Sequence, residues 1–333
     1  CITKPDGLIP QVGDNDNGRF LKLQPVCKKI KVSDAKQNYS TLGDYEDLPE
    51  HDDYWDENYL DHRHLISSIN GLFKRQDFDS YIGDQFYEGY IISKIMPSFP
   101  FPSATHMIKN ALQKTGKDKD IGIDSFKSGN IQQIVIPVQD SSIKKGLTFS
   151  AFPSFGLYLY RSNRLYLAIR CNTNPNTLTN HAHNDQLSII LNVDGKDLII
   201  DPGTYLYSPI PDQRNKYRSI SAHFAPQSET EPASLSKGLF YIDNYKTAEI
   251  IRADKDIFIG RYCSDLYSLE TQIEIKEHSI EIVNTISGDN ALRLPPSYEF
   301  ANTTNGRYLF IRKKNCIYES KCYGQLNKSD AIH

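Results

Sequence analysis

The sequence lacks several features that would place it in a specialised class of protein. It has no run of about 18 apolar residues, which excludes a membrane-spanning helix. Its formal net charge is -3, and the missing basic excess argues against nucleic acid as the main partner. Six cysteines in 333 residues are too few for a disulfide framework. Cys316 and Cys322 are candidates for pairing in an oxidising compartment, but free thiols are the favoured interpretation.

Methionine is not the first residue, and no signal-peptide pattern follows Cys1. We therefore expect the chain to be a piece of a longer protein. A composition of 39% hydrophobic and 24% charged residues is ordinary for a soluble globular protein, and the length is enough for two domains. Tryptophan occurs once and tyrosine 21 times, which suits both a carbohydrate-binding surface and β-structure in general.

The first part of the chain is predicted to be helical. Residues 41–61 are acidic with interleaved aromatics, which indicates a solvated loop or a helix entry. Apolar residues then recur at helical spacing up to Phe73, and a second helix is expected over residues 81–95, before Pro97. Ser103 is a plausible N-cap for a third helix that ends before Gly116.

After about residue 125 the apolar period changes from helical to alternating. Strands or hairpins are predicted over residues 131–138, 147–151, 156–171, 187–201, 248–263, 272–286 and 307–318. Frequent strands with short polar turns indicate antiparallel rather than parallel sheet. We therefore predict an α+β multidomain chain, with a helical segment at 1–125 followed by a large antiparallel β-sandwich at 126–333.

A glycine-rich and acidic turn lies near the start of the chain, in the segment DGLIPQVGDNDNGRF. Asp14 and Asp16 resemble half of a calcium-binding loop. The glutamate that such a loop requires downstream is missing, so we interpret this segment as a loop with Asx turns.

The most informative stretch is residues 181–223, HAHNDQLSIILNVDGKDLIIDPGTYLYSPIPDQRNKYRSISAH. If its opening is extended, His181 and His183 share a face. An Asp-Gly pair then predicts a hairpin whose return strand brings Asp201 back toward the histidines, and His223 follows a loop. Two imidazoles and a carboxylate suit zinc, although the pattern alone is equally compatible with ordinary core or surface histidines.

The motifs HAHNDQLS, LIIDPGTYLY and RNKYRSISAH together resemble the signature of the heparinase II/III-like polysaccharide lyases, which include alginate-lyase-like relatives. The segment FPSFGLYLYRSNRLYLAIRC is similar to the strand pair before that signature. GLIPQVGDNDNGR is similar to a turn late in the helical domain. The resemblance covers roughly residues 7–225. It implies the end of an α/α toroid followed by a β-sandwich, an acidic polysaccharide bound between them, and a periplasmic or secreted location.

The resemblance also implies roles for individual residues. His183, Asp201 and His223 would hold a divalent metal, often zinc, in a structural role, and His181 would face the cleft as a catalytic group. One departure is Phe224, which follows His223 where relatives often have asparagine. The toroid's catalytic asparagine and tyrosine lie upstream of the glycine-rich turn in the family, so we expect them to be absent from this chain.

Elimination from a uronic acid removes the C5 proton beside a carboxylate and expels the C4 oxygen. The site must therefore supply a base, an acid and a partner for the carboxylate. A neutral imidazole is a suitable base near pH 7, and a tyrosine hydroxyl is a suitable acid. The candidate catalytic residues are His181, Tyr205 and Arg218, and the candidate substrate-binding residues are Arg214, Asn184 and Tyr217.

Two other functions remain open from the sequence. One is a catalytically inactive carbohydrate-binding protein that keeps the fold and the metal. The other is a hydrolase in which zinc activates water.

Overall fold

The structure is a computed structural model that describes residues 2–15, 17, 22–42, 48–83, 86–96, 131–174, 181–207, 210–235, 242–287, 290–314, 319–321 and 325–327. The predicted third helix after Ser103 and the Cys316–Cys322 pair lie outside these residues. The domain boundary near residue 125 also lies outside them and stays a prediction. Among the described helices, none combines the length and the apolar character needed to cross a bilayer.

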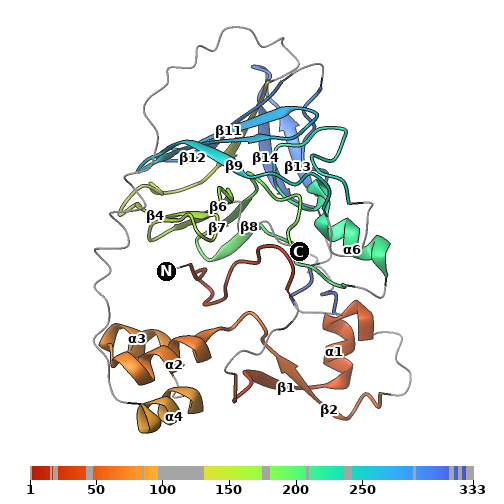
Figure 1. Cartoon of the computed structure of the whole chain (residues 1–333). Coiled ribbons are helices and arrows are strands. Elements are labelled where there is room, and N and C mark those ends of the chain that lie inside the picture. Colours follow the sequence, from red (N-terminus) through yellow and green to blue (C-terminus); the bar gives the residue numbers. More distant parts are fainter. Residues whose placement is uncertain are drawn as a thin grey trace.

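Three short helices lie together in the N-terminal part of the chain: α2 (Arg63–Phe73), α3 (Gln76–Ile82) and α4 (Tyr87–Ile95) (Figure 1). The predicted helix end at Phe73 is confirmed, because Lys74 adopts a left-handed conformation with φ 55°. The single helix predicted over 81–95 is wrong. Gly83 has φ 69°, which the α-helix cannot accommodate, so α3 ends there and α4 starts again at Tyr87.

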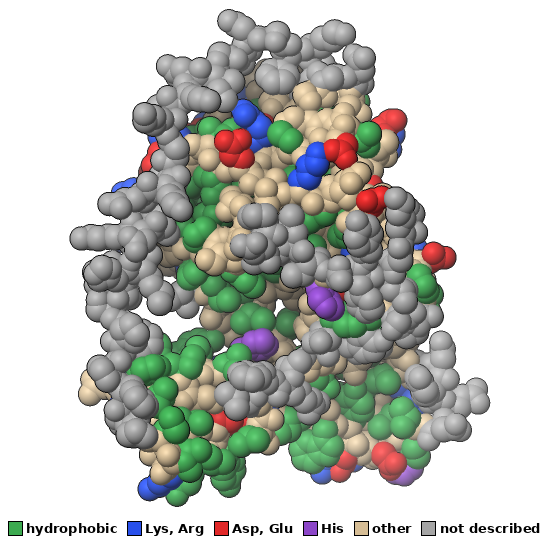
Figure 2. Space-filling view, viewed as in Figure 1, with side chains coloured by type: hydrophobic (Ala, Val, Ile, Leu, Met, Phe, Trp, Pro, Cys, Tyr) green, Lys and Arg blue, Asp and Glu red, His purple; other side chains and the backbone are tan. Residues whose placement is uncertain are grey.

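Helix α2 packs against both α3 and α4. The contact with α4 is close, because a Cβ at Gly89 would lie 2.8 Å from the carbonyl oxygen of Ser67. On the other side of α4, apolar side chains are exposed, among them Tyr87, Tyr90 and Ile95. Figure 2 shows hydrophobic side chains gathered over this part of the molecule.

The segment between residues 27 and 57 contains a strand pair that the sequence analysis did not predict. Strands β1 (Cys27–Lys31) and β2 (Asp53–Glu57) pair antiparallel, and α1 (Val32–Asn38) and the 3₁₀ turn η1 (Ser40–Leu42) lie between them. The prediction of a loop or helix entry over 41–61 is therefore wrong for β2. Its acidic residue Asp53 faces Lys29 and Lys31 of the partner strand, with ion-pair distances of 2.5 and 2.9 Å.

The rest of the described chain is mostly strand, in two sheets (Figure 1). The first has seven strands in the order β13-β14-β3-β12-β11-β10-β9, and the second is the meander β4-β5-β6-β7-β8. All neighbours pair antiparallel except β14 and β3. The strands are β3 (Ile131–Pro137), β4 (Thr148–Phe152), β5 (Leu157–Arg161), β6 (Leu165–Arg170), β7 (Ile189–Val193), β8 (Lys196–Ile199), β9 (Ala248–Ala253), β10 (Ile257–Cys263), β11 (Ser268–Ile275), β12 (Ser279–Ile286), β13 (Tyr298–Asn302) and β14 (Tyr308–Lys313).

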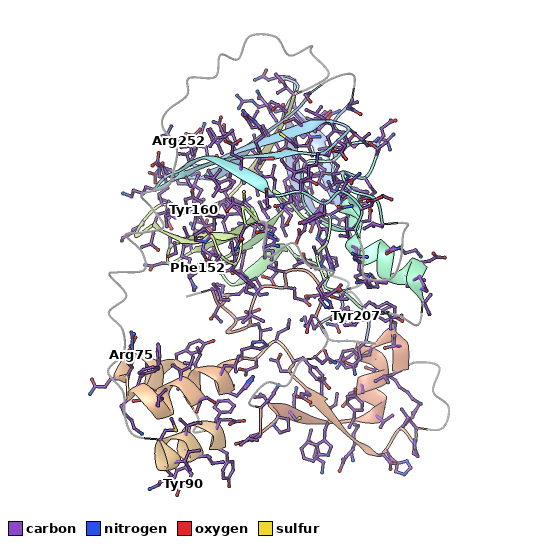
Figure 3. The ribbon with its side chains drawn as sticks, in the orientation of Figure 1. Arg75, Tyr90, Phe152, Tyr160, Tyr207 and Arg252 are labelled. Carbon is purple, nitrogen blue, oxygen red and sulfur yellow. The ribbon has the colours of Figure 1, made fainter. Side chains whose placement is uncertain are left out.

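The two sheets share one hydrophobic core. Buried residues alternate along β11 and β12, so one face of the seven-stranded sheet points into that core. Tyr160 of β5 contributes to the core from the other sheet, and its hydroxyl donates a 2.6 Å hydrogen bond to the carbonyl of Ile257 in β10 (Figure 3). The strand-rich character predicted for this part of the chain is confirmed, although β13 was not predicted.

The five-stranded sheet is covered on its second face as well. Strands β5, β6 and β7 are buried along almost their whole length, and a second cluster that includes Leu159 and Tyr166 lies on the outer side. Ile2 and Val12 pack against this cluster, and the hydroxyl of Tyr166 donates to the carbonyl of Ile2 at 2.7 Å. The first residues of the chain therefore run along the five-stranded sheet, as Figure 1 shows. The predicted toroid stays a prediction.

Candidate active site

The HAH motif lies in a loop between β6 and β7, and not at the start of a strand. The strand predicted from residue 187 begins two residues later, at Ile189. Leu187 has φ 64°, and the amide of Ser188 donates to the carbonyl of Asp185, which closes a turn before the strand. This turn leaves residues 181–185 outside the ladder, where their side chains reach other segments.

One of those segments is α6 (Pro211–Arg218), which the sequence analysis predicted to be a loop. The signal was present, because proline at the first helical position and Asp212 in the first turn are typical of a helix start. Arg214, Tyr217 and Arg218 have the spacing of one helix face, and all three are buried. The end of α6 is joined to the HAH loop, since the amide of Asn184 donates to the carbonyl of Arg218 at 2.9 Å.

Asp14 is the residue at the centre of the site that the sequence analysis did not identify. Its carboxylate is completely buried and is contacted by three side chains. Oδ1 lies 3.0 Å from Nε2 of His183, while Oδ2 lies 3.1 Å from Nδ1 of His181 and accepts a 2.7 Å hydrogen bond from Arg214. Burial by itself raises the pKa of Asp14, but the hydrogen bonds and charges of His183 and Arg214 outweigh burial and lower it.

A signal for Asp14 existed in the sequence, because the segment QVGDN belongs to the turn that resembles the lyase family. The interpretation as a simple Asx loop was incomplete. Asn15 does accept a hydrogen bond from Asn17, as an Asx turn requires. Its amide, however, donates to the hydroxyl of Thr204 just after the DPG turn, at 2.7 Å. The segment is thus bonded to the site's own loops.

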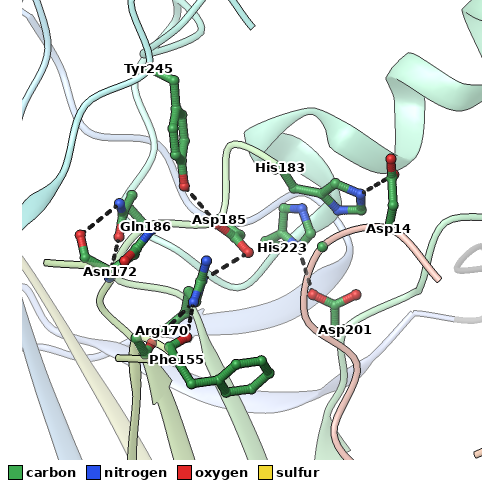
Figure 4. Close-up of polar contacts among 12 residues, drawn as sticks. Asp14, Phe155, Arg170, Asn172, His183, Asp185, Gln186, Asp201, His223 and Tyr245 are labelled. Carbon is green, nitrogen blue, oxygen red and sulfur yellow. Dashed lines mark hydrogen bonds and ion pairs between the residues drawn. The ribbon is translucent and has the colours of Figure 1, made fainter. Parts of the chain in front are cut away.

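A second carboxylate–imidazole pair lies beside the first (Figure 4). Oδ2 of Asp201 is 3.0 Å from Nδ1 of His223, and both side chains are buried. Burial disfavours both charged forms, yet the opposite charge of each partner prevails, so the pKa of His223 is raised and that of Asp201 is lowered. The rings of His183 and His223 have centroids 5.4 Å apart. The structure therefore brings together the three residues predicted as metal ligands.

The donor chemistry of these residues suits zinc, the metal that the resemblance implies. Nδ1 of His183 and Nε2 of His223 are buried, and in the described residues neither has a hydrogen-bond partner. The other nitrogen of His183 faces Asp14, as is usual for a metal-ligating histidine. The other nitrogen of His223 faces Asp201, which is itself a predicted ligand. As the side chains stand, no group of three His, Cys, Asp or Glu residues within the described ranges is arranged to hold an ion. The chemistry thus fits zinc, and the full ligand set stays a prediction.

Two buried guanidinium groups belong to the site, and one of them pairs with Asp14. Arg214 and Arg218 are completely buried, although the sequence analysis placed them at a substrate-facing position. The pKa of Arg218 is lowered to about 10, first because burial penalises its charge and then because the cation of Arg214 is close. Their contact with a substrate stays a prediction.

Three tyrosines lie around the site. The ring that packs beside His181 is that of Tyr207, with centroids 6.0 Å apart, and the guanidinium of Arg214 lies over the same ring at 5.9 Å. Tyr205 packs instead on Tyr217, with centroids 5.7 Å apart. Tyr205 also has φ 63°, an unusual backbone conformation for a residue other than glycine. The roles predicted for Tyr205 and Tyr217 stay predictions.

Asn184, a predicted substrate-binding residue, is buried and engaged within the protein. Its side-chain amide donates to Oε2 of Glu231 at 2.6 Å and to the carbonyl of Ala233 at 2.8 Å. Glu231 also accepts from the amide of Ile220, which begins the short turn before His223. Asn184 and Glu231 therefore join the HAH loop to the SAH loop, and substrate binding by Asn184 stays a prediction.

A buried ion pair supports the HAH loop from beneath (Figure 4). The carboxylate of Asp185 lies 3.3 Å from Nε of Arg170 and accepts a 3.2 Å hydrogen bond from the hydroxyl of Tyr245. Arg170 also donates to the carbonyl of Phe155, in the turn between β4 and β5. The loop is thus fixed to the five-stranded sheet through Arg170 of β6.

Comparison with known families gives a match over residues 144–237, to the family described as Heparinase II/III-like, C-terminal. The resemblance found in the sequence is confirmed. The heparinase II/III-like segment includes the five-stranded sheet, the HAH and DPG motifs and the SAH loop. Asp14 lies outside the matched residues.

Several solved structures are similar. A heparinase III gene product has 16% identity and a TM-score of 0.40, over 55% of this chain and 33% of that chain. The heparan sulfate lyase HepC from Pedobacter heparinus has 15% identity and a TM-score of 0.39, over 54% and 32%. The chain thus spans about a third of the length of the solved structures it matches. No curated protein matches the sequence.

Proposed function

We propose that the protein is a polysaccharide lyase that cleaves an acidic, uronic-acid-containing polysaccharide, with or without sulfate groups, by β-elimination. The observation that supports this most is the place of His181. Its side chain is 55% exposed, while the carboxylate it contacts is fully buried. A half-exposed imidazole held by a buried carboxylate, inside a heparinase II/III-like segment, is suited to move a proton at the protein surface.

In the proposed reaction, His181 accepts the proton from C5 of the uronic acid. A carboxylate is an acceptor only, so the ring nitrogen that faces Asp14 carries the hydrogen. Nε2 is then the nitrogen with a lone pair for the substrate proton.

The acid and the partner for the substrate carboxylate are supplied by neighbouring groups. The departing C4 oxygen needs a proton, for which Tyr205 is the proposed donor, with Tyr207 as the alternative that packs on His181. The negative charge that develops beside the substrate carboxylate is stabilised by the cations of Arg214 and Arg218. Because both guanidiniums are buried, this stabilisation is less screened than at an exposed surface.

We also propose that a zinc ion is held by His183, Asp201 and His223. When bound, the ion supplies a structural cross-link between the HAH loop, the DPG turn and the SAH loop. The support for this comes from the donor types and the two buried imidazole nitrogens described above.

The test of the lyase proposal is the full gene product incubated with alginate, heparan sulfate and other uronate polymers, while the absorbance of the unsaturated product is followed. We expect a rise in absorbance with at least one polymer and a loss of about 10²-fold or more in His181→Ala. His278→Ala is the matched control, because His278 is an exposed histidine in the turn between β11 and β12. Binding of a polymer without any rise in absorbance would favour the carbohydrate-binding alternative.

Chelation separates the lyase from a zinc hydrolase. If zinc cross-links the loops, its removal lowers the thermal unfolding temperature, and activity declines along with the folded fraction. If zinc activates water, chelation abolishes turnover while the fold is unchanged, and the product carries no new double bond.

A further inference from the structure

Both histidines of the HAH motif point to one carboxylate, and that carboxylate comes from the N-terminal segment of the chain. Asp14 contacts His181 and His183 through different oxygens, at 3.1 and 3.0 Å. It precedes them by more than 160 positions in the sequence.

The backbone around Asp14 is fixed independently of its side chain. The amide of Asp14 donates to the carbonyl of His181 at 3.0 Å, and the carbonyl of Gly13 accepts from the hydroxyl of Thr204. Gly13 has φ 65°, and a Cβ at this position would lie 2.7 Å from the carbonyl oxygen of His181. Glycine at this position therefore allows the segment to lie close to the HAH loop, and the close contact places the Asp14 carboxylate beside the two rings.

The chemistry of the three partners determines where the hydrogens lie. Arg214 is a permanent cation that donates to Oδ2 at 2.7 Å, so Asp14 is ionised and can only accept. The two imidazole nitrogens that face it must then both carry hydrogen. In a neutral ring this corresponds to the Nδ1–H form of His181 and the Nε2–H form of His183.

We propose that Asp14 is the positioning residue for both histidines of the HAH motif and fixes a different tautomer in each. In His181 the lone pair is left on Nε2, and in His183 it is left on Nδ1. One buried carboxylate thereby leaves Nε2 of His181 able to accept a proton. In His183 it leaves the lone pair on Nδ1, the nitrogen that points away from Asp14. The catalytic role of His181 rests on the proposed lyase function. The assignment of the two tautomers does not depend on that function.

The tautomers can be measured directly in the wild-type chain. The chain has nine histidines, and labelling them with ¹⁵N allows a long-range ¹H–¹⁵N correlation spectrum at pH 8, which shows on which ring nitrogen each histidine carries its hydrogen. The signals of the two residues are assigned with His181→Ala and His183→Ala. We expect hydrogen on Nδ1 of His181 and on Nε2 of His183. The opposite tautomer in either residue would overturn the proposal, whatever the activity of the protein.

The Asp14→Asn variant then tests whether Asp14 is what fixes the two tautomers. Its amide offers one acceptor oxygen and one donor group, so it cannot accept from both rings, and we expect the tautomer of at least one to change. The matched control is Asp6→Asn, an exposed aspartate in the same segment, which should leave both signals as in the wild type. An unchanged tautomer pattern in folded Asp14→Asn would refute the role assigned to Asp14.

The kinetic consequence is measured in the full gene product on the polymer that it cleaves. We expect kcat of Asp14→Asn to fall by about 10- to 100-fold, the usual effect of removing a carboxylate that orients an imidazole, with KM within about threefold. A fall confined to KM would contradict a positioning role. If the wild type cleaves no polymer, the proposed function fails, and the tautomer spectra still decide the role of Asp14.

Discussion

The backbone amide of Asp14 donates a hydrogen bond to the carbonyl oxygen of His181, although the two residues are 167 positions apart in the sequence. This bond joins the N-terminal segment to the loop that carries the HAH motif. It also places the side chain of Asp14 between His181 and His183, where the carboxylate contacts both rings. The site is thus assembled from the N-terminal segment and a loop between β6 and β7 in the middle of the described chain.

Gly13→Ala should disturb this junction. At φ 65° an alanine is strained, and its Cβ would lie 2.7 Å from the carbonyl oxygen of His181, so the segment must move. We expect a loss of about 2–4 kcal/mol in the free energy of unfolding, measured by denaturant titration, together with lower activity. Gly7→Ala is the matched control, because Gly7 has φ 84° but nothing within 4 Å of its Cβ position. Gly7→Ala should lower the free energy of unfolding by only about 1 kcal/mol. Equal losses in the two variants would show that backbone strain alone, and not the contact with His181, causes the effect.

His183→Ala and His181→Ala should separate the metal from the chemistry. We expect His183→Ala to lose bound zinc, because a proposed ligand is removed, and His181→Ala to keep its zinc while losing activity. The measurement is zinc per chain by mass spectrometry of the purified proteins, alongside the rate on a uronate polymer. Full zinc and full activity in both variants would show that the assigned roles are wrong.

Asp185→Ala should strongly destabilise the fold. It removes the carboxylate that faces Arg170 and Tyr245 and leaves a buried guanidinium without its charge partner. We expect a loss of about 3–5 kcal/mol, measured by denaturant unfolding. The matched control is Asp254→Ala, which removes an exposed partner of Arg252 and should cost less than about 1 kcal/mol. Similar losses in both would mean that the Arg170 pair contributes no more than a surface pair.

The contact between Asp61 and Arg63 predicts a pH dependence of stability at the start of α2. Burial by itself raises the pKa of Asp61, but the hydrogen bonds from Arg63 outweigh it and lower the pKa. A carboxyl whose pKa is lower in the folded state stabilises the fold above its unfolded pKa of about 3.9. That contribution is lost as the pH falls from there through the folded pKa.

Asp61→Asn should therefore lose stability near neutral pH and show a smaller further loss between about pH 5 and pH 2 than the wild type. The measurement is the free energy of unfolding across this range. Asp52→Asn, which changes an exposed aspartate, should follow the wild-type curve. Parallel curves for Asp61→Asn and the wild type would argue against the lowered pKa.

The sequence by itself determined the strand-rich part of the chain and the family of the segment 144–237. Alternating apolar residues specify strands locally, because side chains of a strand alternate between its two faces. The motifs also identified His183, Asp201 and His223 as residues that meet. The break at Gly83 and the helix that begins at Pro211 were local features too, with signals that the sequence analysis did not use.

Only the tertiary structure decided the position of Asp14. In the sequence it is one acidic residue in a polar turn, and although the turn resembles one in the lyase family, nothing there indicates what Asp14 contacts. Its partners His181, His183 and Arg214 come from distant segments, and no periodicity or spacing connects them to it. The burial of both arginines was likewise decided by packing, because a guanidinium on a helix is buried only where other segments cover that face.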